Sequence, residues 1–412
     1  MLQNLQIDPK RLWDMLMTTA QLGGTPKGGI CRLTLTDWDR QVRDWFKAEC
    51  EALGCTVTVD EVGNMFAVRP GRRDDIAPIA MGSHLDTQPT GGKFDGVLGV
   101  LAGLEVLKTL HGSGYETNAP VMLVNWTNEE GSRFAPAMLG SGVYAGVFDR
   151  AYADSRVDRQ GVTFAEALDG IGYRGESPAG SVEIGAMFEL HIEQGPILEA
   201  EGKTIGIVQG VQGIRWYEAT VKGQEAHTGS TPMTMRRNAL LGATRLIEAV
   251  DAIAKARPPA VGTVGLVEVK PNSRNVIPGE VFFSVDFRHP EDAVLDDMEA
   301  ALEAAVEEVR AATGLDIVCE RIWSSPPVVF HKDLIACVRE GAATAGYPAR
   351  DIISGPGHDA CYVNRVAPTT MIFVPCKDGI SHNEAESTEP GECAAGAQVL
   401  LNAVLAYDRT LS

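Results

Sequence analysis

The sequence contains no long hydrophobic run and no excess of positive charge. No apolar stretch reaches the roughly 18 residues that a membrane-spanning helix requires. The 55 acidic residues outnumber the 36 basic residues, which gives a formal net charge of −19. This balance argues against nucleic acid or an anionic membrane surface as a partner. A negatively charged substrate would need local positive charge, from metal ions or from a suitably placed arginine.

A paired-cysteine framework is also absent from the sequence. The eight cysteines contain no C-x-x-C pair and are spread over 412 residues, so reduced thiols are the better interpretation. Residues 1–10 lack the basic start and apolar core of a secretory signal. Both observations favour a cytoplasmic protein. The cysteines are Cys31, Cys50, Cys55, Cys319, Cys337, Cys361, Cys376 and Cys393.

The length and the order of the apolar runs predict an α/β protein with two domains. A chain of 412 residues exceeds one ordinary hydrophobic core. Residues 212–327 follow the order β-α-β-β-α-β, the split βαβ or ferredoxin-like arrangement. We expect them to form a domain inserted into a larger one, 1–211 with 328–412. The expected strands of the insert are 215–221, 263–269, 280–288 and 316–323, and its helices are 235–254 and 293–312.

In the larger domain, apolar runs alternate with amphipathic segments, as expected for layered α/β proteins. The expected helices are 12–22, 37–53, 97–110, 334–345 and 391–406. The expected strands are 56–59, 65–68, 77–81, 121–126, 186–191, 204–208 and 370–374. Several of these strands end in histidine or acidic residues, and those positions carry the main functional signal.

The first two such strand ends supply one histidine and several carboxylates. His84, Asp86 and Asp95 follow the run 77–81, and Glu129 and Glu130 follow the run 121–126. Imidazole and carboxylate groups together suit zinc and related divalent ions. Of two adjacent glutamates, one can bind a metal ion while the other transfers a proton. We expect the Asp86 carboxylate to orient the His84 ring by accepting from its second nitrogen.

Two further strands end near histidines. His191 ends the strand 186–191, and His382 follows the strand 370–374. An open α/β sheet binds ligands at the carboxyl ends of its strands. Taken singly, each residue has an ordinary explanation, such as a buried structural histidine or a solvated acidic turn. Together they predict a two-metal hydrolase site, in which two three-ligand groups share Asp95. The five candidate ligands are His84, Asp95, Glu130, His191 and His382.

Four other segments carry candidate functional residues that also have an ordinary structural interpretation. In chain order, these interpretations are a surface histidine, a hairpin connection, a solvated strand end and a flexible loop. The residues are His227 in segment 223–230, Asn275 in segment 272–279, Arg288 at the end of strand 280–288, and Gly357 and His358 in segment 354–359.

These motifs together resemble the N-carbamoyl amino-acid amidohydrolase branch of the di-zinc aminoacylase/carboxypeptidase superfamily. That branch contains β-ureidopropionase, N-carbamoyl-L-amino-acid hydrolase and allantoate amidohydrolase. The resemblance covers nearly the whole chain, and His191 marks this branch because many relatives carry a carboxylate there. The motifs are Gly82-Ser-His-Leu-Asp86, Gly92-Lys-Phe-Asp-Gly96, Asn128-Glu-Glu-Gly-Ser-Arg-Phe134, His191-Ile-Glu-Gln-Gly195, Ala226-His-Thr-Gly229, Asn272-Ser-Arg-Asn275, Gly355-Pro-Gly-His358 and Ser381-His-Asn-Glu384.

The resemblance implies a metal-binding α/β catalytic domain with an inserted split-βαβ dimerisation domain, and therefore a homodimer. It implies two divalent ions per subunit. One ion would lie on His84, Asp95 and His191, and the other on Asp95, Glu130 and His382. Zinc is expected from the ligands, although manganese, cobalt or nickel could serve.

The resemblance also implies roles for residues outside these two ligand groups. Glu129 would be the general base, with Asp86 and His227 as further catalytic residues. His227 and Asn275 are expected to reach the active site of the neighbouring subunit. The residues expected to hold the substrate are Gln194, His227, Asn275, Arg288, Gly357 and His358.

The implied activity is hydrolysis of the carbamoyl C–N bond of N-carbamoyl-β-alanine or N-carbamoyl-L-α-amino acids, which yields an amino acid, carbon dioxide and ammonia. Allantoate amidohydrolase is the alternative, because it shares every catalytic residue. His191 and Gln194 make an aminoacylase or dipeptidase less favoured. A thiol hydrolase that uses Cys361, three residues after His358, would leave the ligand set unexplained. A non-catalytic binding protein with this fold would not need Glu129 or the complete set of candidate metal ligands.

Overall fold

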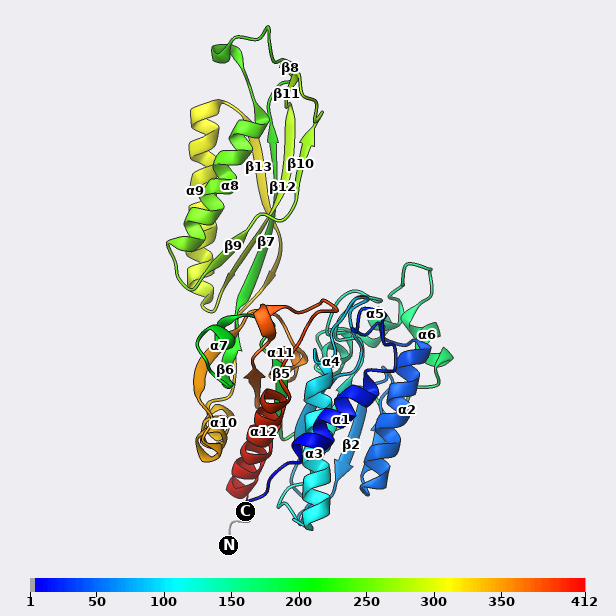
Figure 1. The fold of residues 1–412 in the computed structure, drawn as a ribbon. Helices are drawn as coiled ribbons and strands as arrows, with labels where there is room; N and C mark the ends of the chain where they lie inside the picture. Colours follow the sequence, from blue (N-terminus) through cyan, green and yellow to red (C-terminus); the bar gives the residue numbers. More distant parts are fainter. Residues whose placement is uncertain (1–3, 412) are drawn as a thin grey trace. The chain divides into compact units, whose positions relative to one another are not determined.

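The computed structural model describes residues 4–411. Residues 1–3 and 412, which are the outer ends of the expected larger domain, lie outside the described residues. The chain divides into two compact units, Met1–Gly210 with Val329–Ser412 and Val211–Val328, called the first and the second unit below. Both units are drawn in Figure 1.

The first unit is built on a nine-stranded sheet, with its four central strands parallel in the order β4-β3-β5-β16. Every residue of these four strands is buried, which explains why they appear in the sequence as nearly continuous apolar runs. The central strands are β3 (Ile79–His84), β4 (Val121–Trp126), β5 (Ala186–Ile192) and β16 (Thr369–Val374). The other strands are β1 (Thr56–Val59), β2 (Met65–Arg69), β6 (Ile205–Val211), β14 (Val328–Val329) and β15 (Ala349–Ser354).

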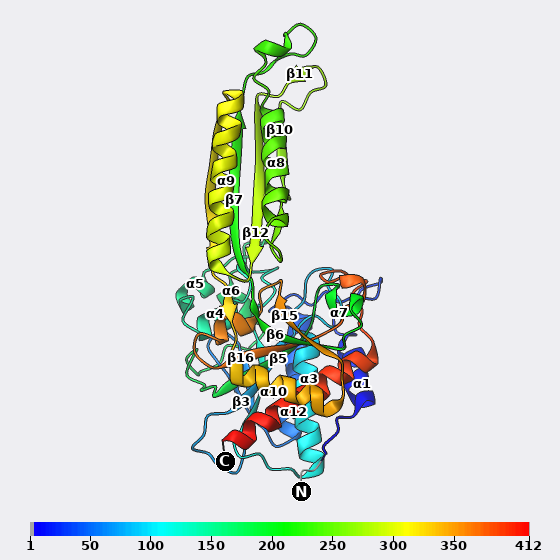
Figure 2. The same cartoon turned by 90° about the vertical axis from the view of Figure 1, so that its left-hand side faces the viewer.

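Helices cover both faces of this sheet. On one face, α3 (Val97–Ser113), α12 (Pro390–Thr410) and α10 (Lys332–Ala345) pack side by side (Figure 2). Because α3 lies between the sheet, α12 and α1 (Pro9–Thr19), it is apolar on nearly all sides. The opposite face packs against α4 (Leu139–Tyr144) and α11 (Asp359–Val363). The remaining helices are α2 (Asp37–Ala52), α5 (Arg150–Asp154), α6 (Phe164–Gly170), α7 (Ile197–Ala200) and the 3₁₀ turn η2 (Lys377–Gly379).

The second unit is a smaller α/β layer. Its sheet has the order β10-β12-β7-β13, which is the strand order of a split βαβ unit, and β9 also pairs with β12. Alternate residues of β7 are buried, because only one face of the sheet packs against α8 and α9. The elements are β7 (Gly213–Lys222), β8 (Ala226–His227), η1 (Met233–Met235), α8 (Ala239–Lys255), β9 (Val261–Thr263), β10 (Val267–Lys270), β11 (Val276–Ile277), β12 (Glu280–His289), α9 (Asp292–Thr313) and β13 (Asp316–Ser325).

Two predicted elements of the second unit differ from the structure. The single strand expected at 263–269 is two strands, because β9 pairs with one end of β12 and β10 with the other end. The helix expected from residue 235 begins at Ala239, because the Asn238 side chain accepts hydrogen bonds from the backbone N–H groups of Leu240 and Leu241. A short capping side chain therefore outweighs the apolar periodicity that precedes it.

A buried ion pair fixes helix α2 against the sheet. Arg43 Nε lies 2.9 Å from Asp39 Oδ2, and both side chains are almost fully buried. The same guanidinium donates to the Gly63 carbonyl and to Thr127 Oγ1, directly after β4. Asp39 also accepts from the backbone of Leu35. These contacts connect α2 to the chain segment that leads into Glu129.

We expect Asp39→Ala to lower the free energy of unfolding of the first unit by about 3–5 kcal/mol, because it leaves the Arg43 charge buried without its partner. Urea denaturation followed by circular dichroism measures the change. Asp37→Ala on the same helix is the matched control, because its pair with Arg40 is exposed and should contribute little. Equal effects of the two substitutions would contradict this assignment.

Among the described residues, no helix combines the length and the apolar character needed to cross a lipid bilayer.

Candidate active site

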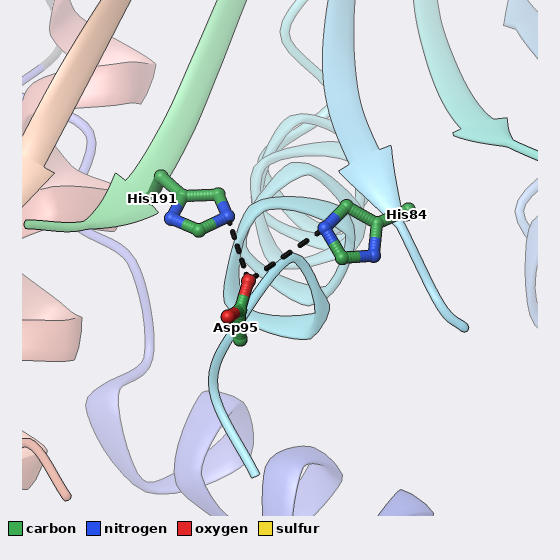
Figure 3. A group of neighbouring side chains, drawn as sticks. All are labelled: His84, Asp95 and His191. Carbon is green, nitrogen blue, oxygen red and sulfur yellow. Dashed lines mark ion pairs between the residues drawn. The ribbon is translucent and has the colours of Figure 1, made fainter. Parts of the chain in front are cut away.

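The carboxyl ends of β3 and β5 place two histidines around Asp95 (Figure 3). His84 is the last residue of β3, His191 lies at the end of β5, and Asp95 stands in the loop just before α3. Asp95 Oδ1 lies 3.2 Å from His191 Nε2 and 3.7 Å from His84 Nε2. These three buried side chains form the first candidate cation group.

The atoms of His84 fit a metal ion. Its Nδ1 lies 2.9 Å from the backbone oxygen of Asp86, so this nitrogen carries the proton and donates. Its Nε2 is therefore a bare lone pair, and it is buried without a hydrogen-bond partner in the part of the chain that the structure describes. Burial lowers the pKa of His84 to about 4, which keeps the ring neutral at neutral pH. A divalent cation would satisfy this orphaned atom.

His191 is held in the same way. Its Nδ1 lies 2.9 Å from the backbone oxygen of Ile192, which leaves Nε2 to face Asp95. Burial lowers the pKa of His191, but the contact with Asp95 and its charge outweigh burial and raise the pKa to about 9. Cation binding at Nε2 requires the neutral ring, so a cation beside Asp95 would oppose this rise in pKa.

The second oxygen of Asp95 belongs to a second group. Asp95 Oδ2 lies 3.4 Å from His382 Nε2, which in turn lies 3.6 Å from Glu130 Oε2. These three side chains form a candidate group of their own. Because each oxygen of Asp95 faces a different pair of ligands, the carboxylate has the placement expected of a bridge between two cations.

A third cluster, Glu189 with His191 and His358, does not fit a cation. Both nitrogens of His191 are already engaged, by Ile192 and by Asp95. Both oxygens of Glu189 accept hydrogen bonds, one from Ser83 Oγ and one from the backbone of Ala360. Glu189 is therefore a structural carboxylate that joins β3, β5 and the start of α11. The charged residue within the apolar run 186–192 was the sequence signal for it.

Glu129 lies beside the two groups and belongs to neither. Its Oε2 is 3.4 Å from His84 Nε2. Burial raises the pKa of Glu129 well above its ordinary value, and the charges of Asp359 and Glu130 add to the rise. Bound cations would oppose this effect. A carboxylate in this position is available for proton transfer.

Asp86 differs from the expectation in its contacts. Its backbone oxygen, and not its carboxylate, holds the His84 ring, since the carboxylate lies 3.8 Å from Nδ1. The two carboxylate oxygens instead face the backbone N–H groups of Glu129 and Glu130, each at 3.3 Å. Asp86 thus positions the glutamate pair. The direct acceptor for the histidine is the carbonyl two residues further on, in the irregular segment that follows the end of β3.

Gly96 is required by the close approach of the Asp95 loop to the histidines. Its φ is +67°, and a Cβ atom at this position would lie 2.2 Å from His84 Nε2. Its backbone N–H also donates to His191 Nε2 at 3.0 Å. A side chain at residue 96 would therefore push a ligand away from Asp95.

We expect Gly96→Ala to weaken cation binding at least about tenfold, since even residues that only support a ligand typically contribute 10- to 100-fold. Cation affinity measured by competition with a chelating dye tests this expectation. Gly114→Ala is the matched control, because Gly114 ends the same helix with φ +64° and no atom near its Cβ direction. Similar losses in both variants would point to backbone strain alone.

The residues expected to hold substrate fall in both units. In the first unit, Gln194 donates to Asp95 Oδ2 at 2.8 Å, and its Oε1 is buried without a partner among the described residues. The His358 ring packs 4.5 Å from the His191 ring, and its Nε2 lies 3.1 Å from Ser354 Oγ. Gly357 precedes His358, close to the side chain of Met138.

In the second unit, His227 is exposed on β8, where it pairs with Val276 of β11. Asn275 is exposed directly before β11. Arg288 lies on β12 with its guanidinium 2.9 Å from Asp286 Oδ2. The described contacts gather the candidate ligands, Glu129, Gln194 and His358 in the first unit, whereas these three residues belong to the second.

The thiol alternative does not fit the structure. Cys361 is buried, and burial raises the pKa of its thiol to about 12. A reactive cysteine needs an accessible thiolate at neutral pH, which this environment disfavours.

An α/β sheet that gathers two ligand groups around one carboxylate, beside a free glutamate, is typical of metal-dependent hydrolases of the two-cation class. Residues 80–406 match the model of peptidase family M20/M25/M40. The chain belongs to this family and is a hydrolase.

Relatives of the chain match over nearly their whole length. The N-carbamoyl-L-amino-acid amidohydrolase of Rhizobium meliloti is 50% identical over 404 residues, which cover 98% of this chain and 97% of the relative. The allantoate amidohydrolase of Bacillus subtilis is 34% identical, with 96% and 97% covered. The crystal structure of an amidase of the hydantoinase/carbamoylase family from Burkholderia multivorans is 56% identical, with a TM-score of 0.96 and 98% of both chains covered.

Proposed function

We propose that the chain hydrolyses the ureido C–N bond of N-carbamoyl amino acids and releases the amino acid, carbon dioxide and ammonia. The division of the two Asp95 oxygens between two ligand groups, with Glu129 beside them, is the observation that carries the hydrolytic site. The 50% identity to a protein named for N-carbamoyl-L-amino acids supports the substrate class.

Two divalent cations per subunit would be held by the candidate groups. His84, Asp95 and His191 would hold one, and Asp95, Glu130 and His382 the other. Imidazole and carboxylate donors favour zinc, and manganese, cobalt or nickel fit the same donors. The cations would supply Lewis acidity, which polarises a carbonyl group and makes water easier to deprotonate.

Side chains of the protein would transfer protons and orient the substrate. Glu129 would take a proton from the attacking water and return it to the nitrogen that leaves. Asp86 keeps the backbone of Glu129 in place, and the Glu129 side chain is itself buried. Gln194 and His358, at the edge of the ligand groups, would hold the ureido end of the substrate. His227 would donate to the oxyanion that forms at the ureido carbon.

Residues of the second unit would recognise the rest of the substrate. Arg288 would bind the substrate carboxylate through paired hydrogen bonds, alongside its existing contact with Asp286. We propose the second unit as a dimerisation domain, in which the exposed His227 and Asn275 serve the active site of the neighbouring subunit. Exposure of both side chains on the β8–β11 segment is consistent with contact to another chain.

We expect Arg288→Ala to raise KM for N-carbamoyl amino acids about 10- to 100-fold, since hydrogen bonds to charged groups contribute roughly 1.5–3 kcal/mol. Steady-state kinetics with the carbamoyl substrate and with its uncharged amide separate charge recognition from general damage. Arg257→Ala, which removes another arginine of the second unit paired with an acidic residue, is the control. An unchanged KM in Arg288→Ala would assign the carboxylate to another residue.

Allantoate hydrolysis is the second candidate activity, supported by the relatives of that name. Ammonia release from N-carbamoyl-β-alanine, an N-carbamoyl-L-α-amino acid and allantoate distinguishes the candidates. Release from the N-carbamoyl-L-α-amino acid at the highest kcat/KM supports the proposal. Release from allantoate alone would keep the catalytic residues and change the substrate.

A further inference from the structure

Glu386 is a buried carboxylate that contacts Asp95, the residue shared by the two ligand groups. It is only 5% exposed, and it belongs to none of the candidate cation groups found among residues 4–411. Its Oε1 accepts hydrogen bonds from the backbone N–H groups of Phe94 and Asp95, both at 3.1 Å. One carboxylate oxygen therefore fixes the main chain of Asp95 just before α3.

The other oxygen of Glu386 reaches the Asp95 side chain through Ser381. Ser381 Oγ lies 2.9 Å from Glu386 Oε2 and 3.0 Å from Asp95 Oδ2. Asp95 Oδ2 is the oxygen that faces His382, the neighbour of Ser381 in the sequence. Glu386 is thus connected both to the backbone of Asp95 and to the orientation of its carboxylate.

The packing of the Asp95 loop confirms how close this contact is. A Cβ atom at Gly92 would lie 2.1 Å from Glu386 Oε1, so the loop can approach the carboxylate only with glycine there. The segment 381–386 also supplies His382, which means that one short segment carries a candidate ligand and the support of the bridging carboxylate. The buried Glu386 side chain joins the two loops that meet at Asp95.

We propose that Glu386, together with Ser381, is a positioning residue that turns the two oxygens of Asp95 toward their separate ligand groups. This inference rests on the proposed two-cation site. Without Glu386, Asp95 loses a support that acts both on its main chain and, through Ser381, on its carboxylate. The cation held by Asp95, Glu130 and His382 would then bind more weakly, because a ligand that must be ordered on binding contributes less affinity.

The test compares Glu386→Gln and Ser381→Ala with the matched control Glu384→Gln. Glu384 lies in the same segment, but it accepts from Thr25 Oγ1 and pairs with Lys27, away from Asp95. The affinity of the full-length, metal-stripped protein for zinc is measured with a competing chelating dye, and its unfolding temperature is measured without metal. Turnover is then measured at limiting and at excess zinc.

We expect Glu386→Gln to weaken the binding of one of the two zinc ions, the one held by Asp95, Glu130 and His382, about 10- to 100-fold. The metal-free unfolding temperature should stay close to that of Glu384→Gln, and excess zinc should restore turnover to within about threefold of the parent. Ser381→Ala should show a smaller loss of affinity in the same direction. Zinc affinity equal to the parent in Glu386→Gln would overturn the inference, as would a lower metal-free unfolding temperature with unchanged affinity. If the parent protein itself binds no zinc, the proposed function fails instead.

Discussion

Glu129→Gln is expected to reduce kcat by about 100- to 10,000-fold, the range that general acid–base groups contribute. The amide keeps the size of the side chain and the backbone contact with Asp86, but it cannot accept a proton from water. Because Glu129 belongs to neither ligand group, both cations should still bind. Steady-state assays of ammonia release give kcat, and metal analysis of the same sample gives the number of bound cations.

Glu130→Gln is the contrasting variant, because it makes the same carboxylate-to-amide change at the neighbouring glutamate. It lies in the group of Asp95 and His382, so it should lower cation content as well as turnover. Near-normal turnover in Glu129→Gln with both cations present would remove Glu129 from its proposed role. Loss of cations in Glu129→Gln would assign it to the ligands.

Asp95→Asn is expected to lower the bound cations from two per subunit to fewer than one and to abolish most activity. The carboxylate supplies one oxygen to each group, at 3.2 Å from His191 and 3.4 Å from His382, so this one substitution should weaken both. An amide offers one weaker oxygen and one N–H₂ group, which repels a cation. The loss of turnover should exceed the roughly 100-fold that supporting residues reach.

The exposed Asp75→Asn is the control for this change, because it removes the same charge from a side chain that is exposed and paired with Arg73. Inductively coupled plasma mass spectrometry of the dialysed proteins gives the cation content. A normal content in Asp95→Asn would show that the two groups do not share this residue.

The strand ends made the grouping of the candidate ligands predictable from the sequence. Apolar runs locate buried parallel strands, and parallel strands that are neighbours must end at one edge of the sheet. His84, Glu130, His191 and His382 could therefore be grouped without coordinates. The family and hydrolytic activity suggested by the motifs were confirmed by the comparisons.

The supporting residues could not be predicted, because their contacts depend on backbone atoms. The His84 ring is held by the backbone carbonyl of Asp86. Every residue has such a carbonyl, so the sequence does not indicate which one holds the ring. Glu386 and Glu189 are buried by loops that come from distant segments, so their partners follow from tertiary packing alone. The same limit applies to the start of α8, which a capping Asn238 decides.

The most direct test of the account is a zinc titration of the metal-stripped protein with an N-carbamoyl-L-amino acid as substrate, read as ammonia release. The account predicts no release without metal, a rise that saturates at two zinc ions per subunit, and loss of activity when chelator is added. Release of ammonia by metal-free protein, unaffected by chelator, would contradict it.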